Sequence, residues 1–121
     1  MESEILIDFL KGAEGAKSAL ERAAEEGVLR VSALSAAEVM AASSKEMRER
    51  TAGLIESFGI IPVDREVAFI AGHYFSRGGR DKPGLDDCIV AATCNKLGAV
   101  LVTRGRRRYP DGGFETMVVK Y

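Results

Sequence analysis

Apolar and polar positions along the chain follow two periods, one typical of strands and one typical of amphipathic helices. Alternation of period two and short β-branched runs predict strands over residues 28–33, 60–63, 100–102 and 116–119. Apolar residues three and four apart predict helices over residues 17–26, 45–57, 65–76 and 86–96, and another that opens at Ser35. Strands that alternate with helices indicate an α/β fold with a central, mainly parallel sheet covered by helices.

Local signals fix several of these boundaries. Asp64 precedes the helix over residues 65–76 and is predicted to be its N-cap. Residues 77–84 combine glycine with charge and form the one clear loop that the pattern predicts.

Length and composition favour one globular domain over residues 1–121. Hydrophobic residues make up 46% and charged residues 29% of the chain, and no apolar run approaches the roughly 20 residues that span a bilayer. The N-terminus is acidic, unlike a secretory signal. The two cysteines, Cys88 and Cys94, lack metal-type spacing, so we expect reduced thiols in a cytoplasmic protein without a membrane partner.

The net charge of −1 hides an uneven distribution, because acids dominate the first half. Bases gather later, at Arg77, Arg80, Lys82, Arg104, Arg106, Arg107 and Arg108. A local basic strip favours a polyanion held at one edge of the domain. For Arg107 and Arg108 alone, a solvated loop is an equally good interpretation.

Two carboxylates stand where predicted helices begin. Ser35 and Glu38 have the spacing of a capping box, a structural role that explains Glu38 without any chemistry. Glu38 also follows the carboxyl end of a strand, where α/β folds place their sites, and Asp87 stands at an equivalent helix start. Both roles are compatible in one residue.

The neighbouring acids need separate interpretations. Asp86 and Asp87 point about 100° apart on a helix, so at most one faces a shared site, and we favour Asp87. Asp8 lies in an apolar run, either as a solvated acid on the outer face of a short helix or as a candidate accessory acid of the site.

The chain lacks the residues that other common catalytic and ligand-binding motifs require. The single histidine, His73, lies among apolar residues and is expected to be partly buried and structural. The chain has no Walker loop, no dinucleotide fingerprint and no zinc-type cluster. Carboxylate chemistry remains, and hard oxygen ligands select Mg²⁺ or Mn²⁺, which promote phosphodiester displacement.

Several segments together resemble the PIN-domain family, and within it the small VapC-type toxins of toxin–antitoxin pairs. The resemblance covers nearly the whole chain and is carried by Glu2-Ser3-Glu4-Ile5-Leu6-Ile7-Asp8-Phe9-Leu10, Val31-Ser32-Ala33-Leu34-Ser35-Ala36-Ala37-Glu38, Asp87-Cys88-Ile89-Val90-Ala91-Ala92-Thr93 and Leu101-Val102-Thr103-Arg104.

The resemblance implies a three-layer α/β/α fold and an endoribonuclease that uses Mg²⁺ or Mn²⁺. Glu38, Asp87 and Glu2 become catalytic metal ligands, with Thr103 a polar neighbour. Arg104, Arg106 and Thr103 are then expected to bind the RNA. An antitoxin partner and a homodimer are also implied.

The chain departs from the family at its first and fourth acids. Glu2 stands where the family has Asp, and Gly105 where many members have an acid or Asn, with Asp111 too distant to replace it. The family also has a central strand before the first acid, where only Met1 precedes Glu2. We favour a true start further upstream over loss of the strand. A PIN-like binding or assembly module without catalysis, and an unrelated α/β domain whose acids are only caps, remain alternatives.

Overall fold

The computed structural model describes residues 1–78 and 83–121. The elements of these residues are, in chain order, α1 (Ser3–Leu10), α2 (Glu14–Glu26), β1 (Val31–Ser32), α3 (Ala33–Ala42), α4 (Arg48–Phe58), β2 (Ile60–Ile61), α5 (Arg65–Ser76), α6 (Leu85–Leu97), β3 (Val100–Thr103), the 3₁₀ helix η1 (Arg106–Arg108) and β4 (Glu115–Val118). None of the described helices has the length and apolar content that a bilayer crossing requires.

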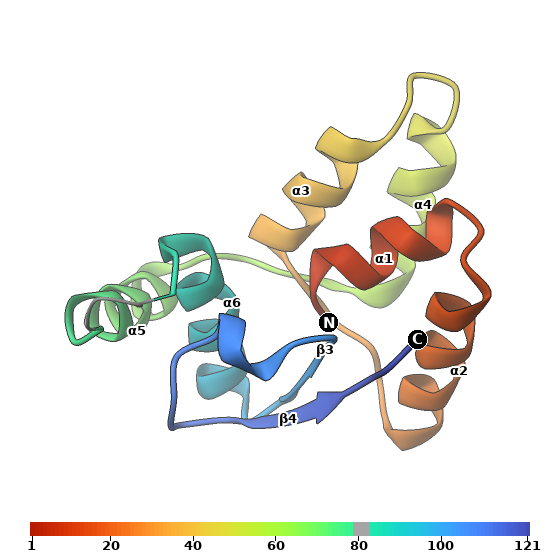
Figure 1. The fold of residues 1–121 in the computed structure, drawn as a ribbon. Helices are drawn as coiled ribbons and strands as arrows, with labels where there is room; N and C mark the ends of the chain where they lie inside the picture. Colours follow the sequence, from red (N-terminus) through yellow and green to blue (C-terminus); the bar gives the residue numbers. More distant parts are fainter. Residues whose placement is uncertain (79–82) are drawn as a thin grey trace.

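The predicted α/β class is confirmed, and the described strands pair in parallel. β1 pairs with β2 and β3 pairs with β4, so the strands form two separate two-stranded sheets. α5 packs against α6, α6 lies beside β3, and α3 contacts α1, α4 and α6 (Figure 1). The fold is therefore mostly helical, with short strands at its centre.

The first predicted strand is much shorter than expected. The alternating pattern predicted a strand over residues 28–33, but β1 spans only Val31–Ser32 and α3 begins at Ala33. The reason is local, because the Ser32 hydroxyl accepts a hydrogen bond from the Ser35 N–H and thereby caps α3. A cap residue ends the strand at the point where it starts the helix.

The chain's first two residues lie between the two sheets. The Met1 ammonium donates to the Arg30 carbonyl at 3.2 Å, beside β1, and the Glu2 N–H donates to the Val102 carbonyl of β3 at 3.1 Å. Beyond Met1 lies a mainly apolar cavity of about 540 Å³, lined by residues of β1, β3, α2 and α6. Residues of both strand pairs therefore line the same cavity.

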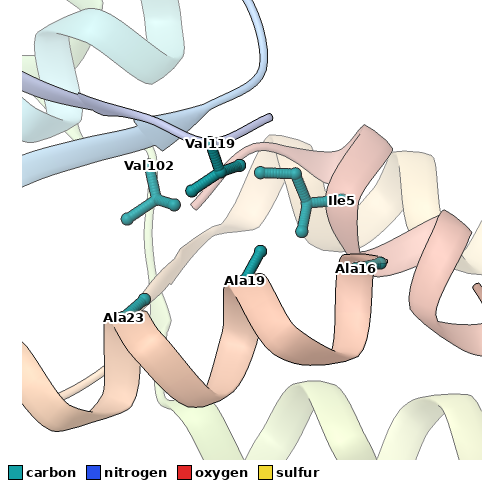
Figure 2. Close-up of a cluster of buried hydrophobic side chains, with 6 residues drawn as sticks. All are labelled: Ile5, Ala16, Ala19, Ala23, Val102 and Val119. Atoms are coloured by element: carbon teal, nitrogen blue, oxygen red, sulfur yellow. The ribbon is translucent and has the colours of Figure 1, made fainter. Parts of the chain in front are cut away.

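Small side chains allow the helices to approach the strands closely. Ala16, Ala19 and Ala23 lie on one face of α2 and point towards Ile5, Val102 and Val119 (Figure 2). On the other side of β3, Cys88, Ala91 and Ala92 of α6 are buried against α5. Cys88 and Cys94 are both buried and not disulfide-bonded, as expected for reduced thiols. This packing holds the first turn of α6 and the end of β3 near the N-terminus.

Candidate functional site

Glu2 is a buried carboxylate that accepts hydrogen bonds from three donors. Its side chain lies at the N-cap position of α1, and the residue is only 2% exposed. Oε1 accepts from the Arg104 N–H at 2.8 Å, whereas Oε2 accepts from the Thr103 hydroxyl and the Tyr109 hydroxyl, both at 2.6 Å. Short hydrogen bonds are typical of a carboxylate acceptor. These three bonds tie the start of the chain to the carboxyl end of β3.

Tyr109 is the residue at this site that sequence reasoning missed. Its ring is buried against α6 and β3, and its hydroxyl reaches Glu2. The bond joins residues 107 positions apart, so no local pattern could reveal it. The one available signal is a tyrosine followed by proline in a segment that is otherwise strongly charged.

Asp87 lies in the first turn of α6, with a side chain that is 18% exposed. Burial raises the pKa of its carboxyl to about 6, and the negative charges of Asp86, Glu38 and Glu2 add to the rise. The positive charge of Arg108 acts in the opposite direction. Glu38 and Glu2 therefore lie near enough to Asp87 for their charges to disfavour its ionisation. We call Glu2, Glu38 and Asp87 the acidic site.

The capping box expected at Glu38 is wrong. α3 begins at Ala33 with Ser32 as its N-cap, so Glu38 lies in the second turn, beyond the open N–H groups. Ser35, the expected cap, is instead buried, and its hydroxyl accepts a hydrogen bond from the Ser32 hydroxyl at 3.0 Å. Glu38 consequently has no capping role to explain it, and its charge faces the same region as Asp87.

Arg108 reaches into the acidic site from η1. Its Nε lies 3.4 Å from Asp87 Oδ1, and its Nη1 lies 3.0 Å from Glu4 Oε2 and 4.0 Å from Glu2 Oε2. Its side chain remains 47% exposed. Arg108 is thus exposed, as the solvated interpretation expects, but three carboxylates lie within 4.0 Å of its guanidinium.

Arg104 contacts Glu4 as well, together with Asp8 and Tyr121. It lies 3.6 Å from Asp8 and 3.8 Å from Glu4, and its guanidinium stacks 4.0 Å from the centre of the Tyr121 ring. Asp8 also accepts a hydrogen bond from the Tyr121 hydroxyl at 2.6 Å. The structure thus places Asp8 with Arg104 and Tyr121.

Two of the other basic residues, Arg106 and Arg77, both contact Asp111. Arg106 donates to the Tyr109 carbonyl at 3.1 Å and pairs with Asp111 at 3.5 Å. Asp111 is the acid that lies too far along the sequence to replace the missing fourth acid. Arg77 donates to the Asp111 carbonyl and lies over the Tyr74 ring. Arg80 and Lys82 lie outside the described residues. The basic strip is therefore held at several places by contacts within the protein.

His73 is exposed on the outer face of α5, so its predicted partial burial is wrong. The apolar residues around it in the sequence do not enclose it, because Phe69 is itself 63% exposed on the same helix. His73 lies on α5, away from the acidic site.

The donor chemistry of the acidic site suits a hard divalent cation, whereas its present geometry does not enclose one. Carboxylate oxygens are the ligands that Mg²⁺ and Mn²⁺ prefer. Within residues 1–78 and 83–121, however, no three acids, histidines or cysteines are grouped closely enough to hold a metal ion. Both Glu2 oxygens already accept hydrogen bonds, and Arg108 supplies the positive charge.

Comparison with known proteins agrees with this arrangement. The PIN domain family model matches residues 2–111. The chain belongs to the PIN-domain family. This result overturns the alternative of an unrelated α/β domain, and it agrees with the parallel strands described above.

The family's toxins are among the relatives of this PIN-domain chain. Ribonuclease VapC10 of Mycobacterium tuberculosis, from strains CDC 1551 / Oshkosh and ATCC 25618 / H37Rv, is 30% identical over 112 residues, which are 91% of this chain and 84% of that protein. A solved toxin–antitoxin complex from Klebsiella pneumoniae matches with a TM-score of 0.75 and 30% identity, over 86% of this chain and 83% of the matched one. The chain is thus a distant relative of VapC ribonuclease toxins.

Proposed function

We propose that this PIN-domain protein is an endoribonuclease that depends on Mg²⁺ or Mn²⁺ and acts as the toxin of a toxin–antitoxin pair. The observation that carries the proposal is the electrostatic coupling of Asp87 with Glu38 and Glu2. Three elements contribute these carboxylates, and the pKa of Asp87 is raised first by burial and then by the negative charges of Asp86, Glu38 and Glu2. Such a like-charge arrangement is unfavourable for stability and is typical of functional sites.

Glu38 and Asp87 are the residues we assign to the metal, with Glu2 as a further acid of the same site. A bound Mg²⁺ or Mn²⁺ would supply an activated water and stabilise negative charge on a phosphodiester. The chain's own contribution is to hold the acids in place. Glu2 is fixed by Thr103, Arg104 and Tyr109, whereas Asp87 is fixed by the packing of α6 against α5.

RNA binding falls to the basic residues that border the acidic site. Arg104 and Arg106 are partly exposed and follow directly after β3, so a phosphate backbone at the site would pass beside them. Each now has acidic partners within the protein, and these exposed ion pairs are weak enough for RNA phosphates to replace. Asp8, paired with Arg104, would take part only through that arginine.

The relatives support the remaining parts of the proposal. A ribonuclease name and a toxin–antitoxin complex among the matches favour an RNA substrate and an antitoxin protein as partner. We also propose a cytoplasmic homodimer, in line with the reduced thiols Cys88 and Cys94 and the family resemblance.

Cleavage of RNA in the presence of Mn²⁺ tests the proposal. The wild-type chain should cleave, Asp87→Asn should abolish cleavage, and the exposed neighbour Asp86→Asn should retain most of it. Circular dichroism should show the same fold for all three proteins. Equal cleavage by the two variants would contradict the assignment of Asp87.

A catalytically impaired PIN-like binding or assembly module is the second candidate. It is favoured by Glu2, whose two oxygens are already hydrogen-bonded, and by Gly105, which supplies no fourth acid after β3. Titration calorimetry with Mn²⁺ separates the candidates. If the protein is a nuclease, Mn²⁺ should bind with a measurable heat that Asp87→Asn abolishes. If it is a binding module, the heat should be the same for the wild type and Asp87→Asn.

A further inference from the structure

Arg108 is positioned as a cation among acids that come from two separate parts of the chain. Glu2 and Glu4 belong to the start of α1, whereas Asp87 belongs to the first turn of α6. The guanidinium lies within 4.0 Å of a carboxylate oxygen from each of them. One side chain thus links both sides of the acidic site.

The backbone that carries Arg108 is fixed, while its side chain is free to reorient. Tyr109, the next residue, is buried and bonded to Glu2, and Arg106 donates to the Tyr109 carbonyl. The Arg108 side chain is 47% exposed and has a long flexible stem. It can therefore leave the carboxylates for solvent without disturbing the packing of η1.

A guanidinium and a divalent cation cannot share these oxygens. Metal ligation requires oxygens within about 2.0–2.6 Å of the ion, so a metal bound to Asp87 would lie beside the positive charge of Arg108. The two cations would repel each other across a separation of a few ångströms. Arg108 and the metal should consequently bind in competition.

We propose that Arg108 is an internal counter-ion that occupies the acidic site in the absence of metal and moves into solvent when a divalent cation binds. This inference rests on the metal dependence proposed above. It makes the arginine a competitor whose removal strengthens metal binding. A purely structural arginine would have no such effect.

Binding of Mn²⁺ alone, followed by the electron paramagnetic resonance signal of the free ion, tests this proposal without RNA. Arg108→Ala should bind Mn²⁺ more tightly than the wild type, by a factor on the order of ten, because a nearby positive charge is gone. Arg107→Ala is the matched control, since it removes the same charge from the neighbouring, exposed position of η1. It should change the affinity less than about twofold, because exposed charges are strongly screened.

A second variant guards against a folding defect. Arg108→Gln retains hydrogen-bond donors for Glu4 and Asp87 but lacks the charge, so it should bind Mn²⁺ more tightly as well, with circular dichroism unchanged. Equal affinities for Arg108→Gln, Arg107→Ala and the wild type overturn the proposal, and so does a complete lack of Mn²⁺ binding in all of them.

The test separates this inference from the proposed function. Tighter Mn²⁺ binding by Arg108→Ala without RNA cleavage by any variant would support the counter-ion and contradict the nuclease. Cleavage that depends on Asp87, with Mn²⁺ affinity unaffected by Arg108, would support the nuclease and contradict the counter-ion.

Discussion

The Tyr109 hydroxyl donates to Glu2 Oε2 at 2.6 Å, and both residues are buried. The bond connects the N-cap residue of α1 with the residue that follows η1. Thr103 donates to the same oxygen, so two neutral hydroxyl groups and one backbone N–H satisfy a buried carboxylate. Glu2 is therefore fixed more firmly than a terminal residue usually is.

Tyr109→Phe should destabilise the protein by about 1–3 kcal/mol, because it removes one donor from a buried carboxylate. Tyr121→Phe is the matched control, since its hydroxyl also donates to a carboxylate at 2.6 Å, but on the exposed surface at Asp8. We expect that control to cost less than about 1 kcal/mol. Urea unfolding measures both, and equal losses would show that burial of Glu2 is unimportant.

Stability should fall as the pH rises between about 4 and 6 through the titration of Asp87. Its pKa is about 6 in the folded protein and about 3.9 in the unfolded chain, so the folded state holds the proton more tightly across this range. The stabilising effect of protonation is complete below the unfolded pKa and lost above the folded one. Allowing for partial solvent access, we expect about 1–2 kcal/mol.

Asp87→Asn isolates this effect from the titration of other acids. Between pH 4 and 7 the variant should gain about 1–2 kcal/mol relative to the wild type in urea unfolding. Asp86→Asn should retain a weaker dependence of the free energy of unfolding on pH, since the charge of Asp86 is one cause of the raised pKa of Asp87. Parallel curves for Asp87→Asn and the wild type would contradict the prediction.

Ser32→Ala should cost about 1 kcal/mol, within a range of 0.5–2, because Ser32 is the N-cap of α3. Glu38→Ala should not destabilise the protein at pH 7, since it removes a charge that repels Asp87 and has no capping role. Thermal unfolding of the two variants measures the contrast. A larger loss of stability in Glu38→Ala than in Ser32→Ala would support a capping role for Glu38 after all.

The helix caps show what the sequence could and could not predict. The Asp64 cap of α5 was predicted and is confirmed, because the acid directly precedes a clear helical pattern and bonds to the Val67 N–H at 2.9 Å. Ser32 and Ser35 are three residues apart, and both have the right chemistry for a cap. The choice depends on where β1 ends against β2, which is a tertiary contact.

The same limit applies to the acidic site. Glu38 and Asp87 were predicted as site residues because each lies near the end of a strand or the start of a helix, and the charge of Glu38 contributes to the raised pKa of Asp87. The partners of Glu2 come from positions more than 100 residues away, and Arg108 finds its acids through the path of the chain after β3. Composition and periodicity hold no information about such distant contacts.

The cavity beyond Met1 predicts that an added strand will stabilise the protein. Its walls include the edges of β1 and β3, where the Arg30 and Val102 carbonyls accept hydrogen bonds from Met1 and Glu2. A strand in this position has sheet on both sides and helices on both faces, so it should be a continuous apolar, β-branched run without proline. Burial also lowers the pKa of the Met1 ammonium, and an amide in its place would remove that unfavourable charge.

Five β-branched residues fused before Met1 should therefore raise the melting temperature by several degrees, because a stabilisation of 1 kcal/mol corresponds to roughly 2–8 °C in a domain of this size. The backbone amides of Arg30 and Val102 should become more protected from hydrogen exchange. A fusion of five alternating glycine and serine residues is the matched control and should change neither. Equal melting temperatures for the two fusions, or protection of these amides from hydrogen exchange without any fusion, would show that the cavity does not accept a strand joined to Met1.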